Sequence, residues 1–276
     1  MSMSKALTIA GSDSGGGAGI QADLKTFQEL RVFGMSAITA ITAQNTLGVH
    51  GVYPLSAEAV AAQIRAIGED MGTDAVKTGM LFDCDIIEAA AEQIRRFGWR
   101  NVVVDPVMIA KGGASLLRAE AIDALCRALL PLAEVVTPNL PEAEALTGVD
   151  ARTMEGRMRA ARELAAMGAR HVVIKGGHGE EPDAVVDLLF DGERFVELTG
   201  RRAATTQTHG TGCTFAAAIA AELAKGRVAG DAVRTAKAYI QAAVEEELGI
   251  GGGHGPTNHW AYMDRERRRV EGGVRR

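Results

Sequence analysis

The sequence predicts an α/β fold in which a mainly parallel central sheet lies between two layers of helices. Short apolar runs rich in β-branched residues alternate with longer stretches that carry apolar residues at i, i+3 and i+4 spacing. The short runs are almost continuously apolar, as expected for parallel strands covered on both faces. Alternation of this kind predicts right-handed crossovers that put helices on both sides of one sheet.

The apolar runs define the expected strands. Parallel strands are predicted over 6–11, 36–42, 75–79, 101–107, 134–139 and 171–177. Two later runs, 184–190 and 194–200, flank Asp191-Gly192, a pair typical of a hairpin turn.

The amphipathic stretches define the expected helices, which span 18–31, 56–71, 85–97, 118–130, 155–168, 212–225 and 229–247. The chain shows no internal repeat, no low-complexity segment and no linker rich in proline or serine. We therefore predict a single domain over residues 1–260. The basic tail, 261–276, is expected to be flexible.

Composition excludes several classes of function. The chain has 276 residues and a formal net charge of −5, which does not suggest a nucleic-acid partner. Its three cysteines form no CxxC pair, so a reducing compartment is expected. The apolar residues before the first glycines are too few for a signal segment, and no apolar run reaches membrane length. We expect a cytoplasmic protein that does not insert into membranes.

The glycine-rich turns suggest phosphate chemistry, because a helix N-terminus presents free N–H groups and the positive end of the helix dipole. A P-loop is excluded since no Gly-Lys pair occurs, and the first glycine-rich turn breaks the spacing of a dinucleotide fingerprint. Gly210, Thr211, Gly212 and Cys213 precede a helix of small residues, and their backbone N–H groups can form an anion hole. The alternative is a glycine-rich N-cap that only permits close packing.

Polar residues at other strand ends point to a bound cation. Asp105, Asn139 and Glu142 follow two different strands, and carboxylates of this kind hold Mg²⁺ together with water and phosphate oxygens. Lys175 ends a further strand and can face a phosphate. Each has a simpler interpretation: Asp105 as a turn former, Glu142 as a partner of the helix dipole, and Lys175 as a lysine extended toward solvent.

The ordered set of motifs resembles one family. GSDSGGGAGIQADLKT, ITAQNT, AVKTGML, VVDPVM, TPNLPEAE, VIKGGH and THGTGCT together resemble the hydroxymethylpyrimidine/phosphomethylpyrimidine kinases of the ribokinase-like superfamily, from about Thr8 to Ala243. The resemblance implies a ribokinase-like three-layer sandwich. It also implies ATP-dependent phosphorylation of 4-amino-5-hydroxymethyl-2-methylpyrimidine and then of its monophosphate, in thiamine biosynthesis. ATP and Mg²⁺ would be the cofactors, and a homodimer is expected.

The same resemblance implies the positions of the ligands. The pyrimidine would contact the segment that begins at Gly11, with Asp23 and Gln44, between apolar walls at Met80 and Val107. An amide such as Gln44 suits an aminopyrimidine, because it offers one donor and one acceptor side. The nucleotide would lie near Asn139, Lys175, Thr208, Gly210, Gly212 and Lys237, with Mg²⁺ near Asp105 and Glu142. Met80, Val107 and Lys237 have equally simple interpretations as core or solvated residues.

Cys213 stands where many members of the superfamily have an aspartate that acts as base. We hypothesise that it assists deprotonation or alignment of the hydroxymethyl group. A thiol of ordinary pKa is mostly protonated at neutral pH, and a helix N-terminus and nearby cations can lower that pKa. Gln207 departs from the family's asparagine and is left out of the site. His209 is expected to orient the loop, His254 to be structural, and 110–118 to act as a flap.

Two alternatives remain open at this stage. A pyridoxine/pyridoxal kinase of the same superfamily would accept a ring of similar size that also carries a hydroxymethyl group. A non-catalytic pyrimidine-binding sensor would keep the fold without turnover. Retention of Asp105, Glu142 and Lys175 together with the glycine-rich turn favours a kinase over a sensor.

Overall fold

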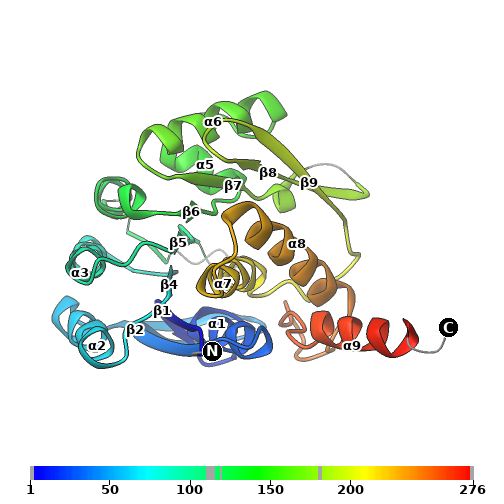
Figure 1. Cartoon of the computed structure of the whole chain (residues 1–276), viewed down its shortest axis with the longest axis horizontal. Helices are drawn as coiled ribbons and strands as arrows, with labels where there is room; N and C mark the ends of the chain where they lie inside the picture. Colours follow the sequence, from blue (N-terminus) through cyan, green and yellow to red (C-terminus); the bar gives the residue numbers. More distant parts are fainter. Residues whose placement is uncertain (1–2, 110–115, 119, 180–181, 274–276) are drawn as a thin grey trace.

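A computed structural model describes residues 3–109, 116–118, 120–179 and 182–273. In it a nine-stranded sheet has the order β3-β2-β1-β4-β5-β6-β7-β8-β9 (Figure 1). β2, β1, β4, β5, β6 and β7 are parallel. β3 pairs antiparallel with β2 on one edge, and on the other edge β8 pairs antiparallel with both β7 and β9. The strands are β1 Lys5–Asp13, β2 Phe33–Asn45, β3 Gly48–Pro54, β4 Ala75–Thr78, β5 Val102–Val104, β6 Val135–Val136, β7 His171–Ile174, β8 Ala184–Phe190 and β9 Phe195–Arg201.

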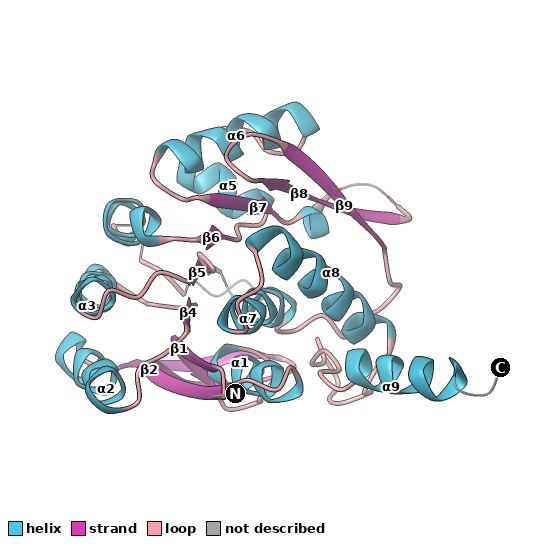
Figure 2. Cartoon of the chain, in the orientation of Figure 1, coloured by secondary structure: helices cyan, strands magenta, loops and turns pink. Residues whose placement is uncertain are grey.

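Helices cover both faces of the sheet, as the sequence predicts (Figures 1 and 2). One face packs against α2, α3, α5 and α6 in a single apolar core, and the other packs against α1, α7 and α8 in a second. The ribokinase-like three-layer α/β sandwich is therefore confirmed. The helices are α1 Gly19–Glu29, α2 Ala57–Asp70, α3 Cys84–Arg96, α4 Ala121–Ala124, α5 Leu140–Thr147, α6 Met154–Ala166, α7 Thr211–Ala224, α8 Ala229–Glu245 and α9 Ala261–Gly273.

The helix that follows the second glycine-rich turn is central to its layer. Every residue of α7 from Thr214 to Ala224 is buried, between α1, α8 and the sheet. Its alanines let it lie close to its neighbours on all sides, which a helix with larger side chains could not do without overlap. Within the described part of the chain, no helix has the length and apolar character needed to cross a membrane.

The sheet topology decides where a ligand can bind. Strands β2 and β4 both flank β1, so the order of strands changes direction at β1. In open α/β sheets the crevice beyond the carboxyl ends of the strands at such a point is the usual ligand site. Gly11 on β1 and Met80 after β4 meet there, and a Cβ at Gly11 would lie 3.0 Å from Met80 Sδ.

The edge of the sheet and the middle of the chain depart from the prediction. The antiparallel strand β3 was not predicted, because GVHGVYP contains two glycines and ends in a proline. The helix predicted over 118–130 is wrong as a continuous α-helix. Only α4 is α-helical there; a π-helical turn, Leu125–Leu129, and a 3-10 turn, Leu130–Leu132, follow as the chain reaches Pro131, which lacks an N–H group.

The basic tail is helical over Ala261–Gly273. Residues expected to be flexible form α9, and Arg265 at its start pairs with Glu245 at 2.8 Å and Glu246 at 2.7 Å. Arg268 reaches Glu246 as well, at 3.1 Å. Arg265 and Arg268 therefore have acidic partners at the end of α8, which the local sequence of the tail does not reveal.

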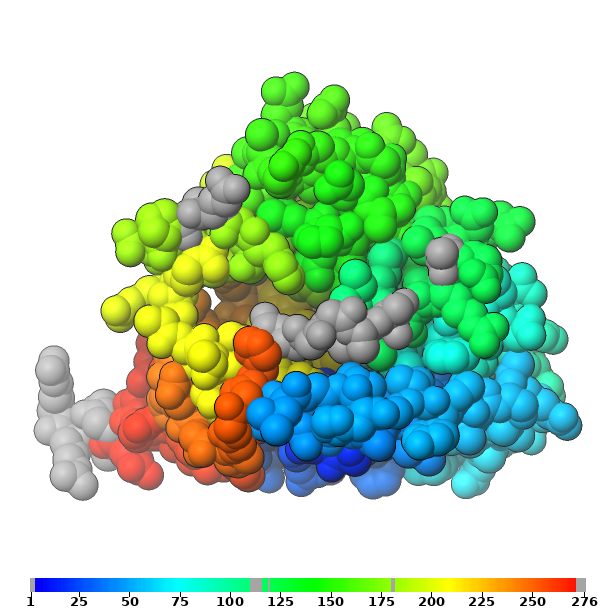
Figure 3. All heavy atoms as spheres, turned by 180° about the vertical axis from the view of Figure 1, so that it is seen from behind, coloured from blue at the N-terminus to red at the C-terminus, as the bar shows by residue number. Residues whose placement is uncertain are grey.

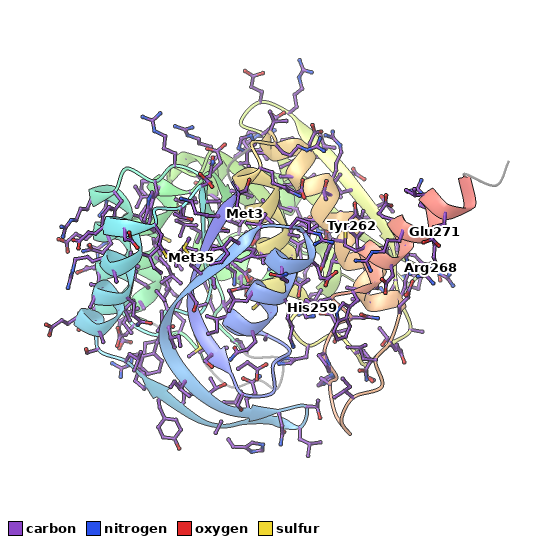
Figure 4. The ribbon with its side chains drawn as sticks, turned by 60° about the horizontal axis from the view of Figure 1, so that its bottom comes forward. Met3, Met35, His259, Tyr262, Arg268 and Glu271 are labelled. Carbon is purple, nitrogen blue, oxygen red and sulfur yellow. The ribbon has the colours of Figure 1, made fainter. Side chains whose placement is uncertain are left out.

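The buried residue His259 lies in the segment before α9 (Figure 4). It contacts Thr214 at the start of α7. His259 is 5% exposed, and its Nε2 lies 3.1 Å from the Thr214 hydroxyl. Burial, with a smaller contribution from the charge of Lys25, lowers the pKa of His259 to about 4. The neutral ring can therefore accept a hydrogen bond from Thr214 throughout the neutral range.

We expect this histidine to make stability fall in acid. Between its unfolded pKa of about 6.5 and its folded pKa of about 4, the unfolded chain binds a proton that the folded chain excludes. The free energy of unfolding should therefore drop by about 2 kcal/mol between pH 7.5 and pH 5 through this group alone. Urea unfolding of the wild type and of His259→Gln, which keeps an acceptor near Thr214, measures the effect. Equal pH dependence in both proteins would contradict it.

Candidate active site

A cavity of about 680 Å³ opens at the carboxyl ends of the parallel strands. In Figure 3 this face of the molecule is hollowed between the yellow segment that leads to α7 and the green part of the chain. Most of the strand-end motifs singled out in the sequence contribute to its wall. The lining residues come from 11–13, 42–44, 105–109, 139–145, 175–178, 201–205 and 208–213, together with β8 and α8.

The two glycine-rich turns pack directly against each other. Gly210, the N-cap of α7, has φ +82°, and a Cβ there would overlap the carbonyl oxygen of Gly17. A Cβ at Gly17 would in turn lie 2.5 Å from Cδ2 of His209. Close packing is therefore one reason for these glycines. The first residues of α7 line the cavity, and their N–H groups have no partner inside the helix, as at any helix start.

A lysine and two carboxylates form a cluster beside this turn. Lys175 Nζ lies 2.9 Å from Asp105 Oδ1 and 3.9 Å from Glu142 Oε2. A Cβ at Gly212 would lie 3.3 Å from Lys175 Nζ, so the start of α7 and the lysine are in contact. Burial and the neighbouring charge of Asp105 raise the pKa of Glu142 to about 7, although Lys175 opposes the shift.

The donors in this cluster suit a divalent cation. Asp105 Oδ2 is buried and has no hydrogen-bond partner among the described residues. Within the same described ranges, no group of three or more histidine, cysteine or acidic residues forms a closed metal site. Mg²⁺ needs no such cage, because one or two carboxylates with water and phosphate oxygens suffice. Glu142 also forms a capping box with Asn139, so its position has a structural reason of its own.

Of the two roles considered for Cys213, deprotonation and alignment, its surroundings favour alignment. The residue lines the cavity at the first turn of α7. Burial raises the pKa of the Cys213 thiol to about 11, with Lys77 opposing the shift and Asp23 adding to it. A helix start and nearby cations can lower the pKa of a thiol. Because the shift is in the other direction, the thiol is protonated at neutral pH and can donate a hydrogen bond.

Asp23 is corrected from a substrate contact to a buried ion-pair partner. It is fully buried and does not line the cavity; its Oδ2 lies 2.9 Å from Lys77 Nζ and accepts from the Thr8 hydroxyl at 2.6 Å. Lys77 is equally buried, in strand β4. The sequence analysis missed Lys77, although a lysine inside an otherwise apolar strand is a signal that could have drawn attention to it.

Gln44 does line the cavity, and a network holds it. Its Oε1 lies 3.1 Å from the Thr42 hydroxyl and its Nε2 lies 3.3 Å from His209 Nε2. His209 Nε2 also lies 2.8 Å from Asp13 Oδ2. Asp13 was missed because it stands inside the glycine-rich run, where an aspartate is usually interpreted as a turn former.

The remaining predicted residues lie in two different parts of the cavity wall. Gly11, Met80 and Val107 lie at the wall with Gln44. Lys237 lines the other end, where its Nζ is 2.7 Å from Asp187 Oδ2, so it is not a solvated helix lysine. Asn139, Thr208 and Thr211 also line the cavity.

Gln207 lies outside the lining, against Gly255 of the C-terminal GGHGP segment. That segment bonds to both sides of the site: His254 N–H donates to Thr46 O at 2.8 Å, and His209 N–H donates to Gly255 O at 3.0 Å. His254 therefore takes part in the strap that joins the end of β2 to the loop before α7. Of the predicted flap 110–118, residues 110–115 fall outside the described part of the chain.

Comparison with known proteins gives the family. The family model described as phosphomethylpyrimidine kinase matches residues 13–258. The chain belongs to the phosphomethylpyrimidine kinase family. The kinase is 59% identical over 262 residues to the hydroxymethylpyrimidine/phosphomethylpyrimidine kinase of Bacillus subtilis, a match that covers 95% of this chain and 97% of that protein. A phosphotransferase is therefore confirmed.

The kinase is also similar to proteins with another named substrate. It is 49% identical over 264 residues to a pyridoxine kinase of Bacillus subtilis, covering 95% of this chain and 97% of the relative. The solved pyridoxal kinase of Staphylococcus aureus in complex with AMP-PCP and pyridoxal has a TM-score of 0.87 and 41% identity, with 95% of each chain covered. Both relatives share the fold, so the fold alone does not decide the substrate.

Proposed function

We propose that this kinase transfers a phosphoryl group from ATP to 4-amino-5-hydroxymethyl-2-methylpyrimidine and then to the resulting monophosphate, as a step of thiamine biosynthesis. One observation carries the proposal. A single cavity brings the Gln44 amide together with the glycine-rich start of α7 and the Lys175 cluster, so a ring and a phosphate chain fit in one site. The 59% identity to a kinase named for both substrates supports the assignment.

Each end of the cavity would have its own task. Gln44 would form hydrogen bonds to the pyrimidine ring, while Met80 and Val107 would pack against it. The N–H groups at the start of α7 and the Lys175 ammonium would stabilise charge on the transferred phosphoryl group, which is the main demand of this reaction. Lys237 would face the nucleotide. Asp105 and Glu142 would hold Mg²⁺, which when bound supplies charge neutralisation to the phosphates of ATP.

Cys213 would act by alignment in this scheme. Its protonated thiol can donate a hydrogen bond to the acceptor oxygen and hold it near the start of α7. A strong base is not required, because positioning and charge stabilisation dominate phosphoryl transfer. The second transfer needs a base even less, since a phosphate monoester already carries negative charge near neutral pH.

The alternative acceptor is pyridoxine or pyridoxal, the ring named for the 49% identical relative. It carries a hydroxymethyl group and would occupy the same part of the cavity. It differs in outcome, because a vitamin B6 kinase stops after one transfer.

Counting ADP separates the two acceptors. With limiting pyrimidine, excess ATP and Mg²⁺, we expect two ADP per pyrimidine, because the monophosphate is itself a substrate. Pyridoxal is run in parallel as the competing acceptor. One ADP per pyrimidine together with a preference for pyridoxal would overturn the proposal. Omission of Mg²⁺ should abolish release with either acceptor, and unchanged turnover after chelation would contradict the role given to Asp105 and Glu142.

A further inference from the structure

We propose that Asp13 and His209 form a positioning pair that fixes the orientation of the Gln44 amide, and thereby which way round an aminopyrimidine ring binds. The inference deepens the proposed function and rests on it. Neither Asp13 nor His209 needs to touch a reacting atom for this role. Both line the cavity beside Gln44.

Asp13 can only accept hydrogen bonds. Its Oδ1 accepts from Gly15 N–H at 2.8 Å, and its Oδ2 accepts from Gly17 and Ala18 N–H at 3.0 and 2.8 Å. Burial alone would raise the pKa of Asp13, but the hydrogen bond to His209 and these backbone donors bring it below the usual value. The side chain is therefore a carboxylate at neutral pH, without a proton to give.

The carboxylate decides that the ring nitrogen facing it, Nε2, carries a hydrogen. His209 Nε2 lies 2.8 Å from Asp13 Oδ2, and a carboxylate at that distance requires a proton on the nitrogen. The ring cannot turn away: Gly17 lies against it, and the backbone of His209 exchanges hydrogen bonds with Gly255 and Thr257. The Nε2 proton then goes to Asp13, and Nε2 keeps no lone pair that could accept from an N–H of Gln44.

That proton decides the orientation of the amide. The nitrogen and oxygen of a glutamine are interchangeable by shape, so their order follows from the neighbours. The structure places the amide nitrogen 3.3 Å from His209 Nε2. A protonated Nε2 requires the amide oxygen at that position instead, so we infer that the two amide atoms exchange places. The amide nitrogen then faces the Thr42 hydroxyl, which is free to accept because its own proton goes to Ser12 O at 2.9 Å. Every donor in the network has an acceptor only in this order.

The fixed positions of the amide nitrogen and oxygen let Gln44 bind a ring in one orientation only. One N–H and one lone pair remain on the free edge of the amide, the N–H on the Thr42 side and the lone pair on the His209 side. An aminopyrimidine has a ring nitrogen beside an amino group, and these two groups match that edge in one order only. If the amide were reversed, the ring would have to turn over, and its hydroxymethyl group would leave the start of α7.

Variants of His209 test the inference. His209→Leu removes the donor, so the amide loses its preferred order; we expect the KM for the aminopyrimidine to rise about tenfold, with a smaller change in kcat. His209→Gln restores an N–H donor near Asp13 and should bring KM back to within about threefold of the wild type. His171→Gln is the matched control, since that histidine also pairs with a carboxylate, Glu134 at 3.3 Å, outside the cavity.

The ratio of kcat/KM for the aminopyrimidine to that for pyridoxal distinguishes positioning from a general loss of structure. Positioning predicts that this ratio falls in His209→Leu and in Asp13→Asn, and that the double variant is no worse than either single variant. Equal losses on both substrates, additive effects, or failure of His209→Gln to recover would overturn the inference.

Calorimetric binding of the aminopyrimidine gives a readout without turnover. Equal affinity in the wild type and His209→Leu would overturn the inference while leaving the proposed function intact. Absence of binding to the wild type would overturn both.

Discussion

Lys77→Met is expected to lower the free energy of unfolding by about 3–5 kcal/mol, the cost of breaking a buried ion pair from one side. Lys77 and Asp23 are both fully buried, and their charged atoms lie 2.9 Å apart. Burial alone would lower the pKa of Lys77, but the charge of Asp23 raises it above the usual value. Methionine would leave the Asp23 carboxylate in an apolar interior, with the Thr8 hydroxyl as its remaining side-chain donor among the described residues.

Thermal and urea unfolding measure the loss, which corresponds to a fall in Tm of roughly 10 °C for a chain of this size. The double variant Lys77→Met/Asp23→Leu should recover much of it, because an apolar pair of similar volume needs no compensation for charge. Arg234→Met is the control: it breaks an exposed pair with Asp231 and should cost less than about 1 kcal/mol. A Lys77→Met protein as stable as this control would contradict the assignment.

Lys175→Met is expected to lower kcat by about 10²–10³-fold, the usual effect of removing one group that stabilises transition-state charge. The ammonium lies between Asp105 and the start of α7, and its side chain is 16% exposed at the cavity. Because methionine keeps most of the side-chain volume, the loss should appear in turnover rather than in folding. The affinity for ATP should fall by a smaller factor than kcat.

Steady-state kinetics with calorimetric ATP binding separate the two effects. Lys225→Met is the matched control, since Lys225 pairs with Glu222 at the far end of α7, away from the cavity. A kcat within about fivefold of the wild type in Lys175→Met would show that the lysine serves structure alone. A loss of ATP binding as large as the loss in kcat would assign it to ground-state binding.

The local pattern of the chain was enough to predict the sheet and the layers. Apolar runs identified β1, β2 and β4 to β9, because burial on both faces leaves a clear mark on a parallel strand. Amphipathic spacing identified most of the crossing helices, but it missed α5 and predicted one continuous helix over 118–130 where the structure has three short turns. Strand β3 was not predicted because an edge strand pairs with only one neighbour and tolerates glycine and proline, which hide its pattern. Helix α9 was not predicted because Arg265 and Arg268 are stabilised by acidic groups at the end of α8, which no local pattern reveals.

The sequence by itself determined which segments end at the cavity, since the carboxyl ends of parallel strands must lie on one edge of the sheet. Only the tertiary structure decided what each polar side chain faces. Asp23 points into the core toward Lys77, and Asp13 reaches His209 across 196 residues of chain. The pKa of the Cys213 thiol rises because of burial, although its place at a helix start alone suggests the reverse. Charge, burial and hydrogen bonding depend on neighbours distant in sequence, and these exist only once the sheet and its two helix layers have assembled.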